Sequence, residues 1–169
     1  MRGSLHELFS FPDPVNEKAA RVVAGVVFVT TAVILATDWY WLLIPMTYGF
    51  WARVLTGPTL SPLGRVAQRV VAPRLGAAKP VPGPPKRFAQ GMGAAMSTAA
   101  LVLGVVIGTH TAADVILAGV LVAAGLESIF ALCLGCKVHS QLERVGMVPE
   151  CESCADLSTR LAPSERHAV

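Results

Sequence analysis

The chain of 169 residues is 53% hydrophobic and 15% charged, and its formal net charge is +3. About a quarter of the residues in an ordinary globular domain are charged, so this composition argues against a soluble domain. No basic stripe interleaved with aromatic side chains occurs, which excludes nucleic acid as an expected partner.

Residues 1–18 read as a polar lead-in on the cytoplasmic side of a membrane. Glu7, Asp13 and two prolines interrupt this segment, so it lacks the continuous apolar core of a cleavable signal peptide. Asn16 is placed to cap the helix that follows. We therefore expect the first apolar run to act as its own insertion signal.

Four long apolar runs follow the lead-in, and basic residues occur only at their ends. Runs of this length with no polar face predict transmembrane helices, and they disfavour the alternative of a soluble four-helix bundle. The predicted fold is an all-α membrane protein with four spans: Ala19–Thr37, Tyr40–Leu55, Phe88–Thr109 and Asp114–Cys136.

Charge distribution predicts the orientation of these spans. Two short turns, around Asp38-Trp39 and around His110-Thr111, join the runs in pairs, and neither turn carries Lys or Arg. Of the 14 basic residues, 12 lie in the lead-in, the central loop and the tail, and Arg21 and Arg53 lie at the adjoining ends of the first and second spans. The positive-inside rule places these three segments, and with them both termini, in the cytoplasm. The spans would then form two helical hairpins within the lipid bilayer.

The central loop, residues 56–87, has two expected parts. Apolar residues at helical spacing over Leu63–Leu75, after Ser61-Pro62, predict an amphipathic helix lying on the inner leaflet. Lys79–Lys86 contains four prolines and predicts an extended connector. The organisation is then a lead-in (1–18), a transmembrane domain (19–136) and a cytoplasmic tail (137–169).

Small residues are frequent in the third and fourth runs. Gly104 and Gly108 stand four residues apart, a spacing typical of helices that pack closely in lipid. This pattern predicts tight packing of the third span against the fourth. Alternatively, the same small residues could pack between two copies of the chain in a homodimer.

All four cysteines lie in the last quarter of the chain, as Cys133 and Cys136 followed by Cys151 and Cys154. Two CxxC pairs separated by 14 residues are typical of a four-thiolate zinc site, because each pair reaches one ion and the loop closes the tetrahedron. Iron is a weaker candidate for the same ligands. The leading interpretation is a non-enzymatic, membrane-anchored cysteine module in which a structural zinc site serves partner docking or an accessory-subunit role.

The alternative is a thiol–disulfide or persulfide relay, in which Cys133 and Cys136 exchange with Cys151 and Cys154. The first pair is expected at the C-terminal end of the fourth helix, where the helix dipole disfavours a thiolate. This placement favours metal over nucleophile. His139 is expected to be a solvated tail residue.

Glu127 is the acidic residue that lies well inside a span. It could accept a proton near the thiols, or it could form a buried ion pair with Arg53 or Arg21. Asp114 is expected to cap a helix together with Thr111. A transporter for a small sulfur species ranks last, because only Glu127 and scattered hydroxyls could line a polar path.

Several short fragments spread over the chain carry a resemblance: Asp13-Pro14, Asn16, Arg21, Ser61-Pro62, Pro85-Lys86-Arg87-Phe88-Ala89 and Cys133-Leu134-Gly135-Cys136. Together they resemble a family of small bacterial integral-membrane proteins of unknown function. The resemblance implies four spans in a bacterial cytoplasmic (inner) membrane, a thiol role, and thioredoxin-like or rhodanese-like partners. Cys151 and Cys154 lie beyond the part that it covers.

Overall fold

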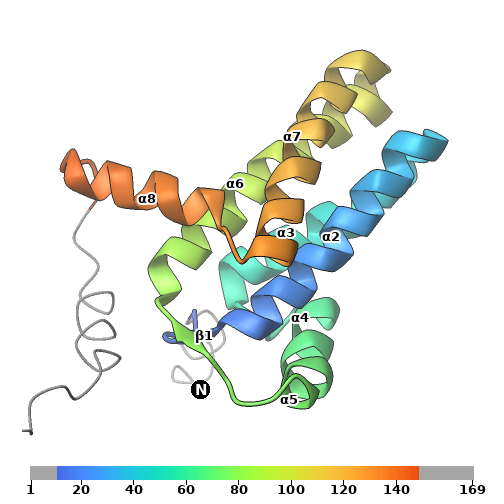
Figure 1. The fold of residues 1–169 in the computed structure, drawn as a ribbon. Helices are drawn as coiled ribbons and strands as arrows, with labels where there is room; N and C mark the ends of the chain where they lie inside the picture. Colours follow the sequence, from blue (N-terminus) through green and yellow to red (C-terminus); the bar gives the residue numbers. More distant parts are fainter. Residues whose placement is uncertain (1–10, 149–169) are drawn as a thin grey trace, which may run out of the picture.

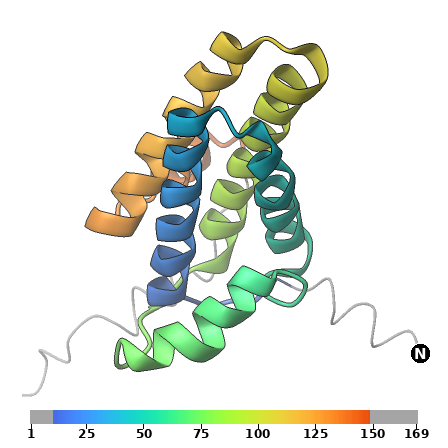
Figure 2. The same ribbon diagram turned by 90° about the vertical axis from the view of Figure 1, so that its right-hand side faces the viewer.

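The computed structural model describes residues 11–148 and is mostly helical (Figure 1). Long helices stand side by side, a shorter helical segment lies across one end of them, and a last helix leaves the bundle sideways (Figures 1 and 2). The elements in chain order are β1 (Val15–Asn16), α2 (Glu17–Thr37), η1 (Tyr40–Leu42), α3 (Leu43–Thr56), α4 (Pro62–Val66), η2 (Ala67–Val71), α5 (Ala72–Arg74), β2 (Pro80–Val81), α6 (Gly83–Leu101), η3 (Val102–Ile107), α7 (His110–Phe130) and α8 (Leu134–Arg144).

Within residues 11–148, three helical segments are long and apolar enough to cross a membrane: α2, the continuous α6–η3, and α7. They correspond to the first, third and fourth apolar runs. The second run folds differently, as the 3₁₀ turn η1 followed by α3, which has 14 residues. At 1.5 Å per residue α3 measures about 21 Å, less than the roughly 30 Å of a hydrocarbon core.

Helices from the two halves of the chain pack against each other. The most extensive interfaces pair α2 with α7 and α3 with α6, while α6 also contacts α7. Ile34, Leu43 and Leu117 lie fully buried in the common core. The largest interfaces thus join the two halves, rather than the two members of each predicted hairpin.

Close helix approach depends on small residues of α6 and η3. A side chain on Gly93 would collide with the ring of Phe50 from α3, and one on Gly104 would lie 2.8 Å from the ring of Tyr40. Gly104 therefore does serve close packing, whereas Gly108 ends η3 with a φ of 80°.

The central loop contains the helix predicted after Ser61. α4, η2 and α5 follow one another without a break from Pro62 to Arg74, and this helix lies across the end of the bundle (Figure 2). Ser61 caps it, since its hydroxyl oxygen accepts a hydrogen bond from the Gly64 N–H at 3.1 Å. Ala67 and Ala72 pack against the start of α2.

The proline-rich connector is shorter than predicted. Its first part, β2, pairs antiparallel with β1, with Val15 opposite Val81. α6 already begins at Gly83, so Pro84 and Pro85 occupy its first turn, where a missing N–H breaks no intrahelical hydrogen bond.

Candidate functional site

The fourth apolar run does not continue as one helix to Cys136, as the sequence suggested. α7 ends at Phe130 because Ala131 adopts a left-handed conformation with a φ of 56°. The Ala131 N–H donates to the Glu127 carbonyl and the Leu132 N–H donates to the Leu126 carbonyl, both at 3.1 Å. The left-handed Ala131 and its hydrogen bond to Glu127 make this an αL type of helix end. The chain therefore turns before it reaches the cysteines.

The first cysteine pair opens a new helix. Cys133 is the N-cap residue of α8, and its Sγ accepts a hydrogen bond from the Cys136 N–H at 3.3 Å. The expectation that this pair lies at the C-terminal end of a helix is thus wrong, and its electrostatic consequence reverses. A helix N-terminus stabilises negative charge, so the dipole here favours a thiolate at Cys133.

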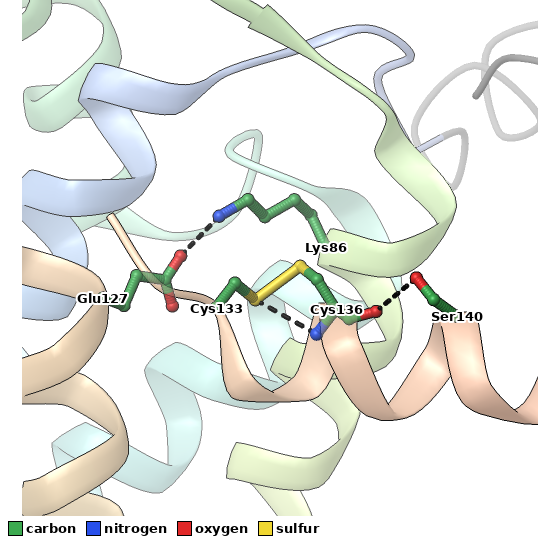
Figure 3. The surroundings of a disulfide bond; sticks show 5 residues. All are labelled: Lys86, Glu127, Cys133, Cys136 and Ser140. Carbon is green, nitrogen blue, oxygen red and sulfur yellow. Dashed lines mark hydrogen bonds and ion pairs between the residues drawn. A yellow bond between two sulfur atoms is a disulfide. The ribbon is translucent and has the colours of Figure 1, made fainter. Parts of the chain in front are cut away.

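Cys133 and Cys136 form a disulfide, with their Cα atoms 5.2 Å apart (Figure 3). Both residues are half-buried. Between them, Gly135 is buried against α6, and a side chain there would lie 2.6 Å from the Cα of Ala89. Glycine at this position therefore lets the start of α8 dock directly on the α6 backbone.

A buried ion pair lies beside the disulfide (Figure 3). Lys86 of α6 donates to the Glu127 carboxylate of α7 at 2.6 Å, and their side chains are 10% and 16% exposed. Lys86 is thus the partner of Glu127, in place of Arg53 or Arg21. Arg21 donates instead to the carbonyls of residues 128 and 129, at the end of α7.

The carboxylate and the disulfide line the same cavity, which has a volume of about 260 Å³. Glu127, Gln90 and Cys133 are polar or reactive members of its lining, and the rest is mostly apolar surface from α2, α6 and α7. The arrangement places a carboxylate–ammonium pair beside a cysteine pair at a helix N-terminus. Thiol–disulfide exchange requires an attacking thiolate, and the helix N-terminus favours that form of the cysteine.

Two further side chains differ from expectation. His139 is 4% exposed, packs edge-on against Phe88, and places its Nδ1 3.5 Å from a carboxylate oxygen of Glu143, so it is not a solvated tail residue. Asp114 accepts a hydrogen bond from the Tyr40 hydroxyl at 2.7 Å and links α7 to η1, instead of capping a helix with Thr111. No sequence signal identifies either tertiary partner.

The second cysteine pair, Cys151 and Cys154, lies outside the described residues. Within residues 11–148 no three His, Cys, Asp or Glu side chains come together as a metal site. The four-thiolate arrangement needs both pairs, so it stays a prediction.

Within residues 11–148, three membrane-length apolar helices and a disulfide at a helix N-terminus define the class, a helical membrane protein with a CxxC disulfide. More specifically, the chain belongs to the family described as Domain of unknown function (DUF4395), whose model matches residues 15–144. The matched segment includes Cys133 and Cys136 and ends before Cys151. The searches of curated proteins and of solved structures found no match.

Proposed function

We propose that this protein is a membrane-embedded dithiol–disulfide exchange protein whose reactive pair is Cys133 and Cys136. The observation that carries the proposal is the position of the disulfide across the first turn of α8, with the Cys136 N–H directed at the Cys133 Sγ. A helix N-terminus lowers the cost of the thiolate that attacks or leaves during exchange.

The exchange transfers two electrons between this pair and a partner dithiol. A partner thiolate attacks the Cys133 Sγ, the bond to Cys136 breaks, and Cys136 leaves as a thiolate that takes up a proton. The second partner thiol then attacks the mixed disulfide and releases Cys133 as a thiolate. The partner becomes a disulfide, the pair becomes a dithiol, and the reverse sequence returns the electrons.

Glu127 is the proposed proton carrier of the site. It lines the cavity that Cys133 also lines, and its ion pair with Lys86 keeps a carboxylate and an ammonium beside the sulfurs. A carboxylate in this position can accept the proton that a cysteine loses before it attacks. Lys86 offsets the negative charge that accumulates when a thiolate forms.

The proposed setting is a bacterial inner membrane, with η1 and α3 as a short fourth crossing and both termini in the cytoplasm. The basic residues of the lead-in, central loop and tail support this orientation. Disulfides in a reducing cytoplasm are usually transient and catalytic, which favours exchange over a structural bridge. The expected partner is a thioredoxin-like or rhodanese-like protein, or the second pair, Cys151 and Cys154.

Zinc bound by Cys133, Cys136, Cys151 and Cys154 is the competing proposal, and the CxxC-x14-CxxC spacing is what favours it. In that case the tail would be held by the metal and the first pair would stay reduced. Metal content and thiol reactivity of one preparation separate the two proposals.

The test uses the full chain purified in detergent without oxygen or chelator. We expect no stoichiometric zinc, and a Cys133–Cys136 pair that equilibrates with a glutathione redox buffer as one two-electron couple. In a background with Cys151→Ser and Cys154→Ser, the added Cys136→Ser change should trap a glutathione adduct on Cys133, because no neighbouring thiol resolves it. The matched Cys133→Ser variant should accumulate less adduct, since the remaining thiol lacks the helix-capping position.

The same Cys136→Ser background tests orientation. A membrane-impermeant maleimide should label Cys133 in inverted vesicles and not in intact cells.

The metal and reactivity measurements decide between the two proposals. About one zinc per chain, with all four thiols protected from reaction, would overturn the exchange proposal and establish the metal site. Cysteines that bind no metal and do not react with glutathione in any variant would exclude both the exchange proposal and the zinc proposal.

A further inference from the structure

A second cavity, of about 70 Å³, lies where α2, α3, α4 and α6 meet, and its polar lining is unusual. Among the described residues, two cationic side chains and three amides contribute to it and no carboxylate does: Arg53, Lys86, Asn16, Gln68 and Gln90. Apolar side chains and glycines complete the wall. Most of the exposed wall is apolar, so the few polar groups that reach it decide which ligand it can hold.

Arg53, in the last turn of α3, is the central group of this cavity. It is 6% exposed, although it carries a full charge. Its Nε donates to the Gln90 side-chain oxygen at 2.8 Å and its Nη1 contacts the Ser61 hydroxyl at 3.4 Å. Its Nη2 is buried and has no hydrogen-bond partner within residues 11–148. An unsatisfied buried donor on a charged group is costly, so an acceptor that reached it would stabilise the structure.

The buried charge of Arg53 has no carboxylate of its own, because no carboxylate in residues 11–148 forms an ion pair with it. The Phe50 ring makes a cation–π contact with the Arg53 guanidinium, 4.8 Å from the ring centroid. The nearby Glu127 is already paired with Lys86 at 2.6 Å. Arg53 is therefore a buried cation that a bound anion could neutralise.

We infer that this cavity binds a single small oxyanion, a phosphate or sulfate group, with the Arg53 guanidinium as its principal ligand. The volume has room for several water molecules, and so for one tetrahedral oxyanion, but not for a nucleotide. A planar guanidinium and neighbouring amides are the donors that proteins use for such groups. The oxyanion is either a free inorganic ion or the phosphate of an anionic lipid headgroup. Gln90 lines this cavity and the cysteine cavity, so the bound anion would sit next to the redox site.

The test measures the melting temperature of the full chain in a neutral maltoside detergent. Phosphate is exchanged for chloride at constant ionic strength, and a second series adds phosphatidylglycerol. A specific anion should raise the melting temperature by about 2–4 °C once the site is largely filled. Arg53→Gln should abolish this rise. Arg69→Gln removes the same charge from an exposed position on η2 and should keep it.

Gln90→Glu supplies a second test that does not depend on the stability of the Arg53 variant. The new carboxylate would stand at the hydrogen-bonding position that Gln90 occupies, 2.8 Å from the Arg53 Nε. It should raise the melting temperature without added anion and cancel the response to phosphate or lipid.

A response to phosphate identifies a free oxyanion, and a response confined to phosphatidylglycerol identifies a lipid headgroup. An equal response in the parent, Arg53→Gln and Gln90→Glu proteins would overturn the assignment. So would the absence of any response to both ligands in the parent protein.

Discussion

Gly135 shows how one residue without a side chain positions the cysteine pair. Its backbone lies against Ala89 of α6, where an added Cβ would be 2.5 Å from the Ala89 Cβ. Both atoms belong to packed helices, so neither can move away easily. The Cys-Leu-Gly-Cys sequence is visible in the printed chain, but Ala89 is far from it along the sequence, and only the fold shows why the third position is glycine.

Gly135→Ala should lower stability and disturb the cysteine pair. Overpacking at a helix contact costs about 1–3 kcal/mol, and here the strain falls on the first turn of α8. The melting temperature should drop by several degrees, and the rate of glutathione exchange at Cys133 should change. Gly91→Ala is the control, since nothing lies within 4 Å of the added Cβ and it should be neutral or stabilising. If Gly135→Ala and Gly91→Ala had the same melting temperature and the same exchange rate, Gly135 would not be needed to position the cysteine pair.

At the scale of elements, the boundary between α7 and α8 decides the chemistry of the site. Glycine or asparagine usually marks a left-handed helix end, but here the residue is Ala131, a strong helix former. Cysteine is also not among the side chains that usually cap helices. Local sequence signals therefore favoured one helix through Cys136, and the docking of α8 on α6 overrides them.

Ala131→Gly should stabilise the protein, because glycine adopts a positive φ without the steric penalty that alanine has there. The expected gain is about 0.5–1 kcal/mol, or a rise of roughly 1–4 °C in melting temperature. Ala123→Gly, the same substitution inside α7, should have the opposite sign, since glycine weakens a helix interior. If both substitutions lowered the melting temperature equally, the left-handed conformation assigned to Ala131 would be wrong.

At the scale of the whole molecule, the Lys86–Glu127 pair ties α6 to α7 beside the cysteines. Apart from the Arg21 hydrogen bonds to the end of α7, the core between the membrane-length helices consists of apolar and small side chains. A charged pair in such surroundings holds one relative arrangement of two helices, because a shift would leave both charges buried and unpaired.

Single removal of either partner should therefore be strongly destabilising. Lys86→Met and Glu127→Leu should each cost about 3–5 kcal/mol, because each leaves one buried charge alone. The double variant should recover most of this loss, as apolar replacements of buried ion pairs often do. Unfolding measured for all four proteins in detergent gives the coupling energy. Additive losses in the double variant would mean that the pair makes no net contribution.

Features that depend on neighbouring residues were predictable from the sequence. The helix after Ser61 lies where its periodicity placed it, Asn16 caps α2, and Asp38 is the turn residue that ends α2. The match of α2, α6–η3 and α7 to apolar runs has the same origin, because length, hydrophobicity and caps act within a few residues along the chain.

The tertiary structure alone decided which distant groups meet. It paired Lys86 with Glu127, buried His139 against Phe88, and turned the first cysteine pair from a helix end into a helix beginning. These outcomes depend on contacts between helices far apart in sequence, where packing and the burial of charge outweigh local propensity. The sequence by itself determined that the chain is helical and apolar enough for a membrane, while the fold determined the charge environment of its sulfur atoms.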